Sequence, residues 1–182
     1  MSYCYDYPRP AVTVDIVLFA PAAQHLQVLL IQRRNAPFRG QWALPGGFLD
    51  MDEELPAAAR RELQEETGLQ VDHLLELGAF AAVNRDPRGR TVSIAYLALH
   101  TGSLPQPQAG DDAAATAWFV CHDLPPLAFD HALIIDRALT RLQTLAASLA
   151  PFCELLTPGL TVAELHALLP VIRNAHSRQP PD

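Results

Sequence analysis

The chain has 182 residues, of which 49% are hydrophobic and 18% are charged, and its formal net charge is −7. This length and composition suffice for one globular core and exclude a largely disordered chain. No apolar run reaches the roughly 18 residues of a membrane span, and the N-terminus shows no basic-then-apolar signal, so we expect a cytoplasmic protein without a membrane partner. The negative charge disfavours general binding to nucleic acids.

Strand-like and helical segments alternate along the chain, which indicates an α/β layered domain. A Pro- and Ala-containing turn separates the first two strands, and the loop Arg34–Gln41 precedes the third. The apolar, strand-like segments are Val12–Phe19, Leu26–Arg33, Trp42–Gly47, Leu74–Val83, Val92–His100 and Ala115–Val120. A late helix is predicted over Ala132–Leu149.

The segment between Gly47 and Leu69 reads GFLDMDEELPAAARRELQEETGL and predicts a second helix in mid-chain. Its start is expected at Asp52–Leu55, because acidic residues suit the positive end of the helix dipole and Pro56 is tolerated in the first turn. Gly68 suits a left-handed C-terminal cap. Intervals of four residues predict a buried stripe, formed by Leu55, Ala59 and Leu63.

Three glutamates share one face of this helix. At 3.6 residues per turn, Glu62, Glu65 and Glu66 fall within an arc of about 100°. Their mutual repulsion, about 1 kcal/mol per pair in water, calls for a cation nearby. Because no His or Cys accompanies them, the ligands indicate Mg²⁺ or Mn²⁺ rather than zinc. A solvated acidic face is the alternative explanation for such a run.

The full pattern is Gly47, five residues, Glu53, seven residues, and then the run from Arg61 to Leu69, and it resembles the Nudix box at every defining position. The resemblance implies a pyrophosphohydrolase with an α/β/α sandwich, in which a mixed β-sheet lies between helices and the box forms a loop–helix–loop motif at one edge. It implies an ion pair between Arg61 and Glu53 that orients the cluster. The implied metal ligands are Glu62, Glu65, Glu66 and the backbone carbonyl of Gly46.

Such a site favours hydrolysis of a diphosphate. Divalent ions neutralise the diphosphate and lower the pKa of a bound water, which attacks one phosphorus in line. The proton of this water is expected to pass to Glu66 or Glu65, or to an acid from another loop. Asp111 and Asp112 are candidates for that outside acid, and the alternative is that this pair only caps a loop.

Two further features bear on the substrate. The segment from Arg85 to Arg90 carries three guanidinium groups in six residues, so Arg85 and Arg88 are candidate ligands of a substrate phosphate or ribose. A solvated hairpin turn is the alternative for this segment. His131 either packs at a helix start or has a metal or catalytic role.

Short segments outside the box are similar to one Nudix branch, which contains ADP-ribose pyrophosphatases and related NAD-biosynthesis repressors. These segments are Tyr7–Val12, Trp118-Phe119 and Leu127–His131, and the similarity runs from about Tyr7 to Leu142. It implies a homodimer that hydrolyses ADP-ribose to AMP and ribose 5-phosphate. The alternatives are another nucleotide substrate (an oxidised dNTP, NADH or a sugar nucleotide) and a non-catalytic nucleotide-sensing regulator.

The sequence predicts a hydrolase domain over residues 1–150 and a short helical appendage with a frayed tail over residues 151–182. Repressors of the branch add a winged-helix domain for DNA. The 32 residues after Ala150 are too few for that domain, and they carry two arginines against three acidic residues. We therefore expect a small-molecule nucleotide partner and no nucleic acid.

Overall fold

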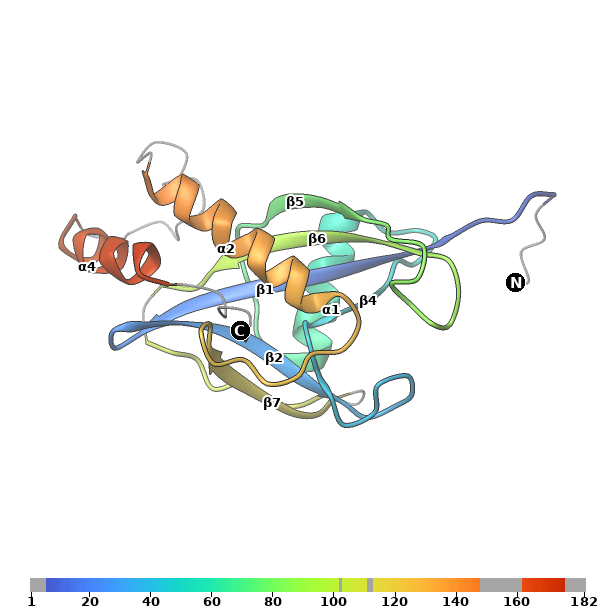
Figure 1. Ribbon diagram of the computed structural model, residues 1–182, viewed down its shortest axis with the longest axis horizontal. Helices are drawn as coiled ribbons and strands as arrows, with labels where there is room; N and C mark the ends of the chain where they lie inside the picture. Colours follow the sequence, from blue (N-terminus) through green and yellow to red (C-terminus); the bar gives the residue numbers. More distant parts are fainter. Residues whose placement is uncertain (1–5, 102, 111–112, 148–161, 176–182) are drawn as a thin grey trace, which may run out of the picture.

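The computed structural model describes residues 6–101, 103–110, 113–147 and 162–175. Its strands form one mixed seven-stranded sheet, with helix α1 against one face and helices α2 and α4 against the other (Figure 1). The strands are β1 (Ala11–Ala22), β2 (His25–Arg33), β3 (Trp42–Ala43), β4 (Gly46–Phe48), β5 (Leu75–Phe80), β6 (Thr91–Leu99) and β7 (Ala113–Val120). The helices are α1 (Leu55–Thr67), α2 (His131–Ala147) and α4 (Val162–Arg173). The predicted α/β/α sandwich is confirmed.

Strand β1 is the centre of the sheet. It runs parallel to β6 over its first nine residues, and antiparallel to both β4 and β2. Its N-terminal half pairs with β4, where Asp15 lies opposite Gly46, and its C-terminal half pairs with β2. Strands β3 and β7 both pair with β2, and β5 closes the other edge on β6. Because β1 pairs with β4 along one half and with β2 along the other, β4 and the residues before it lie in the middle of the sheet.

The side chains of β1 alternate between two cores. Val17 and Phe19 pack with α2 and α4, whereas Ile16 and Leu18 pack with α1. A strand covered on both faces is apolar along nearly its whole length, as β1 is. Asp15 is the one charged residue in this strand, and it is buried.

Some predicted boundaries move. β1 extends to Ala22, so the hairpin turn shortens to Ala23 and Gln24, with Ala23 at a left-handed φ of 53°. Pro21 lies beyond Phe19, the last residue of β1 that pairs with β6, so one side of β1 is a sheet edge at this point and a proline is tolerated there. The predicted single strand Trp42–Gly47 is two short strands with different partners, β2 and β1. β5 ends at Phe80 because the chain turns soon after, where the Arg85 N–H donates to the Ala82 carbonyl at 3.2 Å.

The described part of the C-terminal segment packs into the main core. Leu168 and Ile172 of α4 are buried in the same apolar cluster as the inner face of α2. The Gln143 side chain of α2 donates to the carbonyls of Ile172 and Ala175 at the end of α4. The remainder of the predicted appendage, including its tail, lies outside the described residues. Among the helices that the structure describes, none is long and apolar enough to cross a membrane.

Candidate active site

Helix α1 carries the acidic cluster on a well-anchored frame. It begins at Leu55 with Pro56 in its first turn and ends at Thr67, and it is capped by Gly68, whose φ of 70° lies in the left-handed region. Ala59 and Leu63 are fully buried against β1, and Leu55 packs beside them. The predicted apolar stripe therefore faces the sheet. Glu62 and Glu66 lie beside this stripe on the helix surface, so they are directed at Gly46 and Gly47 of β4.

Arg61 connects the acidic groups at the start of the box. Its guanidinium donates to both carboxylate oxygens of Glu53, at 2.5 and 3.0 Å. It also contacts Glu62 at 2.8 Å and Glu65 at 3.1 Å. The hydrogen bonds from Arg61 lower the pKa of the Glu53 carboxyl. The ion pair that the resemblance implied is therefore present, within a larger network.

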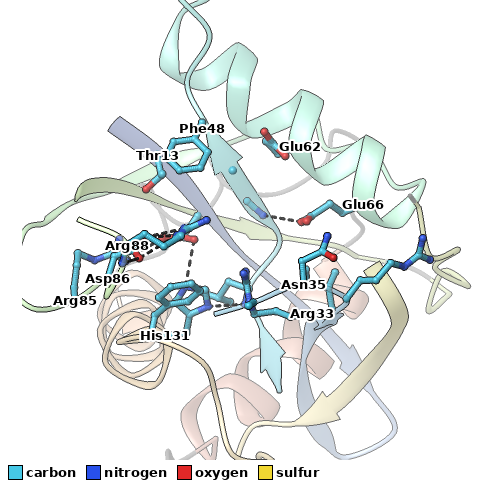
Figure 2. Close-up of a pocket in the computed structure, with 18 of the residues that line it drawn as sticks. Thr13, Arg33, Asn35, Phe48, Glu62, Glu66, Arg85, Asp86, Arg88 and His131 are labelled. Carbon is cyan, nitrogen blue, oxygen red and sulfur yellow. Dashed lines mark hydrogen bonds and ion pairs between the residues drawn. The ribbon is translucent and has the colours of Figure 1, made fainter. Parts of the chain in front are cut away.

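Glu62 and Glu66 reach the cavity, whereas Glu65 turns aside. Oε2 of Glu66 accepts the backbone N–H of Gly46 at 2.9 Å, so α1 is tied directly to β4 (Figure 2). The Glu62 carboxylate lies so close to Gly47 that a Cβ at that position would meet it at 2.3–2.6 Å. The side chain of Glu65 is 58% exposed and bound to Arg61. Gly47 is thus required for close approach of Glu62 to the backbone.

These carboxylates form one wall of a cavity of about 350 Å³ between α1, the start of α2 and the loop that follows β2. Guanidinium groups from several segments line the cavity as well (Figure 2). The arginines are Arg33, Arg34, Arg61, Arg85 and Arg88. Such a mixture of carboxylates and guanidinium groups suits a ligand that combines a diphosphate with bound cations.

The wall opposite α1 contains a buried polar network around Asp15. The Asp15 carboxylate accepts the hydroxyl of Ser93 and the guanidinium of Arg85. Arg85 also forms two hydrogen bonds to Asp130, at 2.7 and 3.0 Å. Burial alone would lower the pKa of Arg85, but Asp130 and Asp15 raise it. Arg85, which was predicted to bind substrate, does line the cavity. Its side chain is only 4% exposed, however, and its guanidinium is already paired with two carboxylates.

His131 joins the same network at the start of α2. Its Nδ1 accepts the backbone N–H of Leu44 at 2.8 Å, and its Nε2 lies 3.5 Å from Oδ1 of Asp15. An Nδ1 that accepts a hydrogen bond carries no proton, so the neutral ring bears its proton on Nε2, facing Asp15. Burial lowers the pKa of His131, although the charge of Asp15 opposes this effect.

Arg88 differs from Arg85 in its exposure. It pairs with Asp86 at 2.8 Å, and its side chain is 43% exposed. Its guanidinium lies over the rings of Phe48 and Phe129, 5.2 and 5.6 Å from their centres. Burial alone would raise the pKa of Asp86, but hydrogen bonds from Arg88 lower it. Arg88 therefore presents an oriented, solvent-accessible cation at the cavity.

The structure brings most of the predicted site residues to this one cavity. Those that line it are Gly46, Arg61, Glu62, Glu66, Arg85 and Arg88. Glu53 and Glu65 are connected to it through Arg61. The predicted acids Asp111 and Asp112 lie outside the described residues.

Sequence reasoning named His131, as a packed histidine at a helix start or a metal or catalytic residue, but it missed Asp15 and Ser93, which share its network. The signal for Asp15 was a charged residue inside an otherwise apolar strand, which is costly unless the charge is paired. No comparable signal marks Ser93, because a serine in a strand is unremarkable.

The donor set fits a hard cation in its chemistry. Glu62, Glu66 and the Gly46 backbone offer oxygen atoms along one wall, and burial raises the pKa of the Glu62 carboxyl, whose ionised form a bound cation would favour. In the part of the chain that the structure describes, no three acidic, His or Cys side chains converge as they would around one ion. Glu65 could join the other two only by leaving Arg61.

A family model for the NUDIX domain matches residues 9–141. The chain belongs to the Nudix family. The predicted Nudix fold and the assignment to the Nudix pyrophosphohydrolases are confirmed at the level of the family. The glutamates of α1 are those of its Nudix box.

Two relatives are similar over most of the Nudix chain. An ADP-ribose pyrophosphatase of Methanocaldococcus jannaschii is 42% identical over 129 residues, which cover 71% of this chain and 73% of the relative. An ADPR responsive transcriptional repressor, NtrR, of Acinetobacter baylyi is 36% identical over 171 residues, which cover 92% of this chain and 68% of the relative. The relatives of this chain therefore include both an enzyme and a transcriptional regulator.

Solved structures give the same result for the Nudix fold. A MutT/nudix family protein from Enterococcus faecalis has a TM-score of 0.82 at 32% identity. The match covers 94% of this chain and 76% of the Enterococcus faecalis chain. The NUDIX domain of Shewanella oneidensis NrtR, solved with ADP ribose, has a TM-score of 0.71 at 38% identity, covering 76% and 94%. The same NrtR, solved with a 27mer DNA, has a TM-score of 0.71 at 37% identity, covering 88% and 75%.

Proposed function

We propose that this Nudix hydrolase cleaves ADP-ribose to AMP and ribose 5-phosphate with the help of Mg²⁺ or Mn²⁺. The observation that carries the proposal is that the carboxylates of the Nudix helix and an arginine-containing wall line the same cavity. A diphosphate requires both features, cation-binding oxygens on one side and guanidinium donors on the other. The similarity to an ADP-ribose pyrophosphatase and to a domain solved with ADP ribose supports this substrate over other nucleotides.

In this proposal the metal ligands are Glu62, Glu65, Glu66 and the carbonyl of Gly46. When bound, the cation supplies charge neutralisation of the diphosphate and acidifies the attacking water. Arg61 holds Glu62 and Glu65, and Glu53 fixes Arg61 in turn. The ligand set thus comes from one helix and one adjacent backbone segment.

The proton of the attacking water is accepted by a carboxylate of the chain. Glu66 is favoured over Glu65, because Glu66 lines the cavity whereas Glu65 is directed to Arg61 and solvent. Asp112 is the remaining candidate from the sequence. Arg88 is proposed to bind a substrate phosphate or ribose, since it is exposed and oriented by Asp86. Arg85 is proposed to contact the substrate while it keeps its ion pairs with Asp15 and Asp130.

The test is a hydrolysis assay with Mg²⁺ on ADP-ribose, NADH, a sugar nucleotide and 8-oxo-dGTP, with the products identified by chromatography. We expect preference for ADP-ribose, AMP as a product, and loss of turnover when EDTA removes the metal. Preference for another of these compounds would retain the Nudix chemistry and refute the proposed substrate. An Mn²⁺ titration in the same assay identifies the better metal.

A second candidate is an ADP-ribose-responsive regulator, favoured by the similarity to NtrR over 92% of this chain. It predicts binding of ADP-ribose, measured by calorimetry, with no turnover under any metal. The DNA complex of NrtR also makes DNA binding a property to measure, against our expectation of no nucleic-acid partner. A homodimer, expected from the resemblance, is tested by light scattering on the same sample.

A further inference from the structure

The backbone from Leu44 to Gly46 is held by three different elements at three successive residues. The Leu44 N–H donates to His131 of α2 at 2.8 Å, and the Pro45 carbonyl accepts the N–H of Ile16 in β1 at 2.9 Å. The Gly46 N–H donates to Glu66 of α1 at 2.9 Å. This segment, which we call the Leu44–Gly46 bridge, is therefore the mechanical link between the α2 wall and the Nudix helix.

The three anchors of the bridge differ in kind. The Ile16 contact is a backbone pair beside the β1–β4 ladder, which any sequence that forms the sheet would make. The anchor to Glu66 uses a side chain of the Nudix box itself. Only His131 attaches the bridge to the opposite wall through a side chain that lies outside the box. That side chain is buried, and its only partners for the two ring nitrogens among the described residues are Leu44 and Asp15.

Asp15 and Ser93 fix the orientation of the imidazole ring. The Asp15 carboxylate lies beside Nε2, and it is itself held by the Ser93 hydroxyl and by Arg85. With the Nε2 proton directed at Asp15, Nδ1 is left as an acceptor for the Leu44 N–H. Two hydrogen bonds, from Ser93 to Asp15 and from Leu44 to His131, together with the 3.5 Å contact between Asp15 and His131, thus connect β6 through β1 and α2 to the bridge.

We propose that His131 is a positioning residue for the hydrolysis, which sets the place of Gly46 and Glu66 by holding the Leu44 N–H. The inference rests on the proposed function for its activity readout but concerns a residue that the Nudix box does not contain. The role requires a hydrogen-bond acceptor at Nδ1 and no proton transfer to the substrate. It therefore makes different predictions for two substitutions of similar size.

The first test compares His131→Asn with His131→Leu. The Oδ1 atom of asparagine can take the place of Nδ1, whereas leucine leaves the buried Leu44 N–H without an acceptor. We expect His131→Leu to lower kcat for ADP-ribose by about tenfold or more with little change in KM, and His131→Asn to restore kcat to within about threefold of the wild type. Leu142→Ala, a buried change in the same helix away from the cavity, controls for lost stability.

The second test is amide hydrogen exchange on the same proteins, which needs no turnover. We expect the amides of Leu44 and Gly46 to exchange about tenfold faster in His131→Leu, and to stay protected in His131→Asn and Leu142→Ala. Unchanged protection in His131→Leu overturns the positioning role, whatever the substrate. Equal loss of kcat in His131→Asn and His131→Leu also overturns it, because the role would then need the imidazole itself. Failure of wild-type turnover with the exchange pattern as expected would refute the proposed function alone.

Discussion

The backbone N–H of Gly46 and the carboxylate of Glu66 form a 2.9 Å hydrogen bond that joins strand β4 to helix α1. The two residues are 20 positions apart, and the intervening loop carries Glu53, which holds Arg61. This hydrogen bond thus joins the backbone just before the Nudix box to a side chain near the end of the box. The carboxylate of Glu66 is buried at this junction and faces the cavity.

Replacement of Glu66 by Gln should abolish most of the activity and leave the fold intact. Glutamine still reaches Gly46 with its amide oxygen, but it has no negative charge for a cation and cannot accept a proton from water. We expect kcat to fall by about a hundredfold or more, measured at saturating substrate and Mg²⁺. Glu54→Gln, an exposed change at the start of α1 with no side-chain capping bond, is the control and should retain wild-type kcat. Wild-type turnover in Glu66→Gln would refute the role of this carboxylate.

Replacement of Gly47 by Ala should separate activity from stability. A Cβ at this position would meet the Glu62 carboxylate at 2.3–2.6 Å, so the flexible side chain of Glu62 would move away. We expect kcat to fall about tenfold or more while the free energy of unfolding changes by less than about 1 kcal/mol. Steady-state kinetics measures the fall in kcat, and urea denaturation measures the change in the free energy of unfolding. In the Glu62→Asp background the shorter side chain avoids the methyl group, and the added effect of Gly47→Ala should shrink; an undiminished effect would argue against the steric explanation.

The Arg85–Asp130–Asp15 network should be a stability element. Removal of one partner from a buried ion pair leaves an uncompensated charge, typically at a cost of about 3–5 kcal/mol. We expect Arg85→Met to lower the free energy of unfolding by an amount in this range, measured by urea denaturation. Arg90→Ala, whose guanidinium only contacts exposed backbone carbonyls, should cost far less. Equal stability of the two variants would contradict the structural role of Arg85.

Arg88 should affect both substrate binding and stability. Its own side chain is 43% exposed, but the Asp86 side chain that it pairs with is only 2% exposed, so removal of the guanidinium leaves a buried carboxylate without its ion-pair partner and should lower the free energy of unfolding. We expect Arg88→Ala to raise KM for ADP-ribose about tenfold, and Arg88→Lys to recover only part of the loss, because lysine cannot form the planar bidentate contact. Steady-state kinetics on both variants decides the point. An unchanged KM in Arg88→Ala would remove this residue from the substrate site.

His131 should make stability depend on pH below neutrality. Burial lowers the folded-state pKa of His131 below its unfolded value of about 6.5, so the unfolded chain binds a proton that the folded chain does not. Its contribution is therefore fully present above about pH 6.5 and is lost as the pH falls toward the folded pKa. The loss is at most about 1.4 kcal/mol per pH unit for one proton. Urea denaturation between pH 5 and 7.5 should show a smaller pH dependence for His131→Asn than for the wild type; identical slopes would contradict the assignment.

The sequence predicted the catalytic helix better than its surroundings. The start and end of α1, its buried stripe and the left-handed Gly68 follow from local propensity and spacing, which a single helix displays directly. The sandwich followed from the alternation of strands and helices and from the Nudix resemblance. The division of Trp42–Gly47 into β3 and β4 was not predictable, because it depends on two partner strands that are distant in sequence.

The second wall of the cavity was likewise invisible to local reasoning. Arg85 and Arg88 stand three positions apart in one loop, and both were predicted to bind substrate. Arg85 is buried in ion pairs with Asp15 and Asp130, which come from opposite ends of the domain, whereas the ion pair of Arg88 is with its neighbour Asp86 and leaves the side chain 43% exposed. Long-range contacts therefore distinguish two residues that composition treats alike.

The attachment of the Leu44–Gly46 bridge to His131 has a consequence for biosynthesis. The chain is made from its N-terminus, so the helix with the glutamates leaves the ribosome well before the residue that anchors the bridge from the other side. A nascent chain that ends before residue 131 contains the whole Nudix box, yet it lacks the imidazole that accepts the Leu44 N–H in the complete domain. The site can therefore be completed only when α2 has been synthesised and has docked on the sheet. Release of a truncated product at that point would yield a protein with every residue of the motif and an unfinished wall.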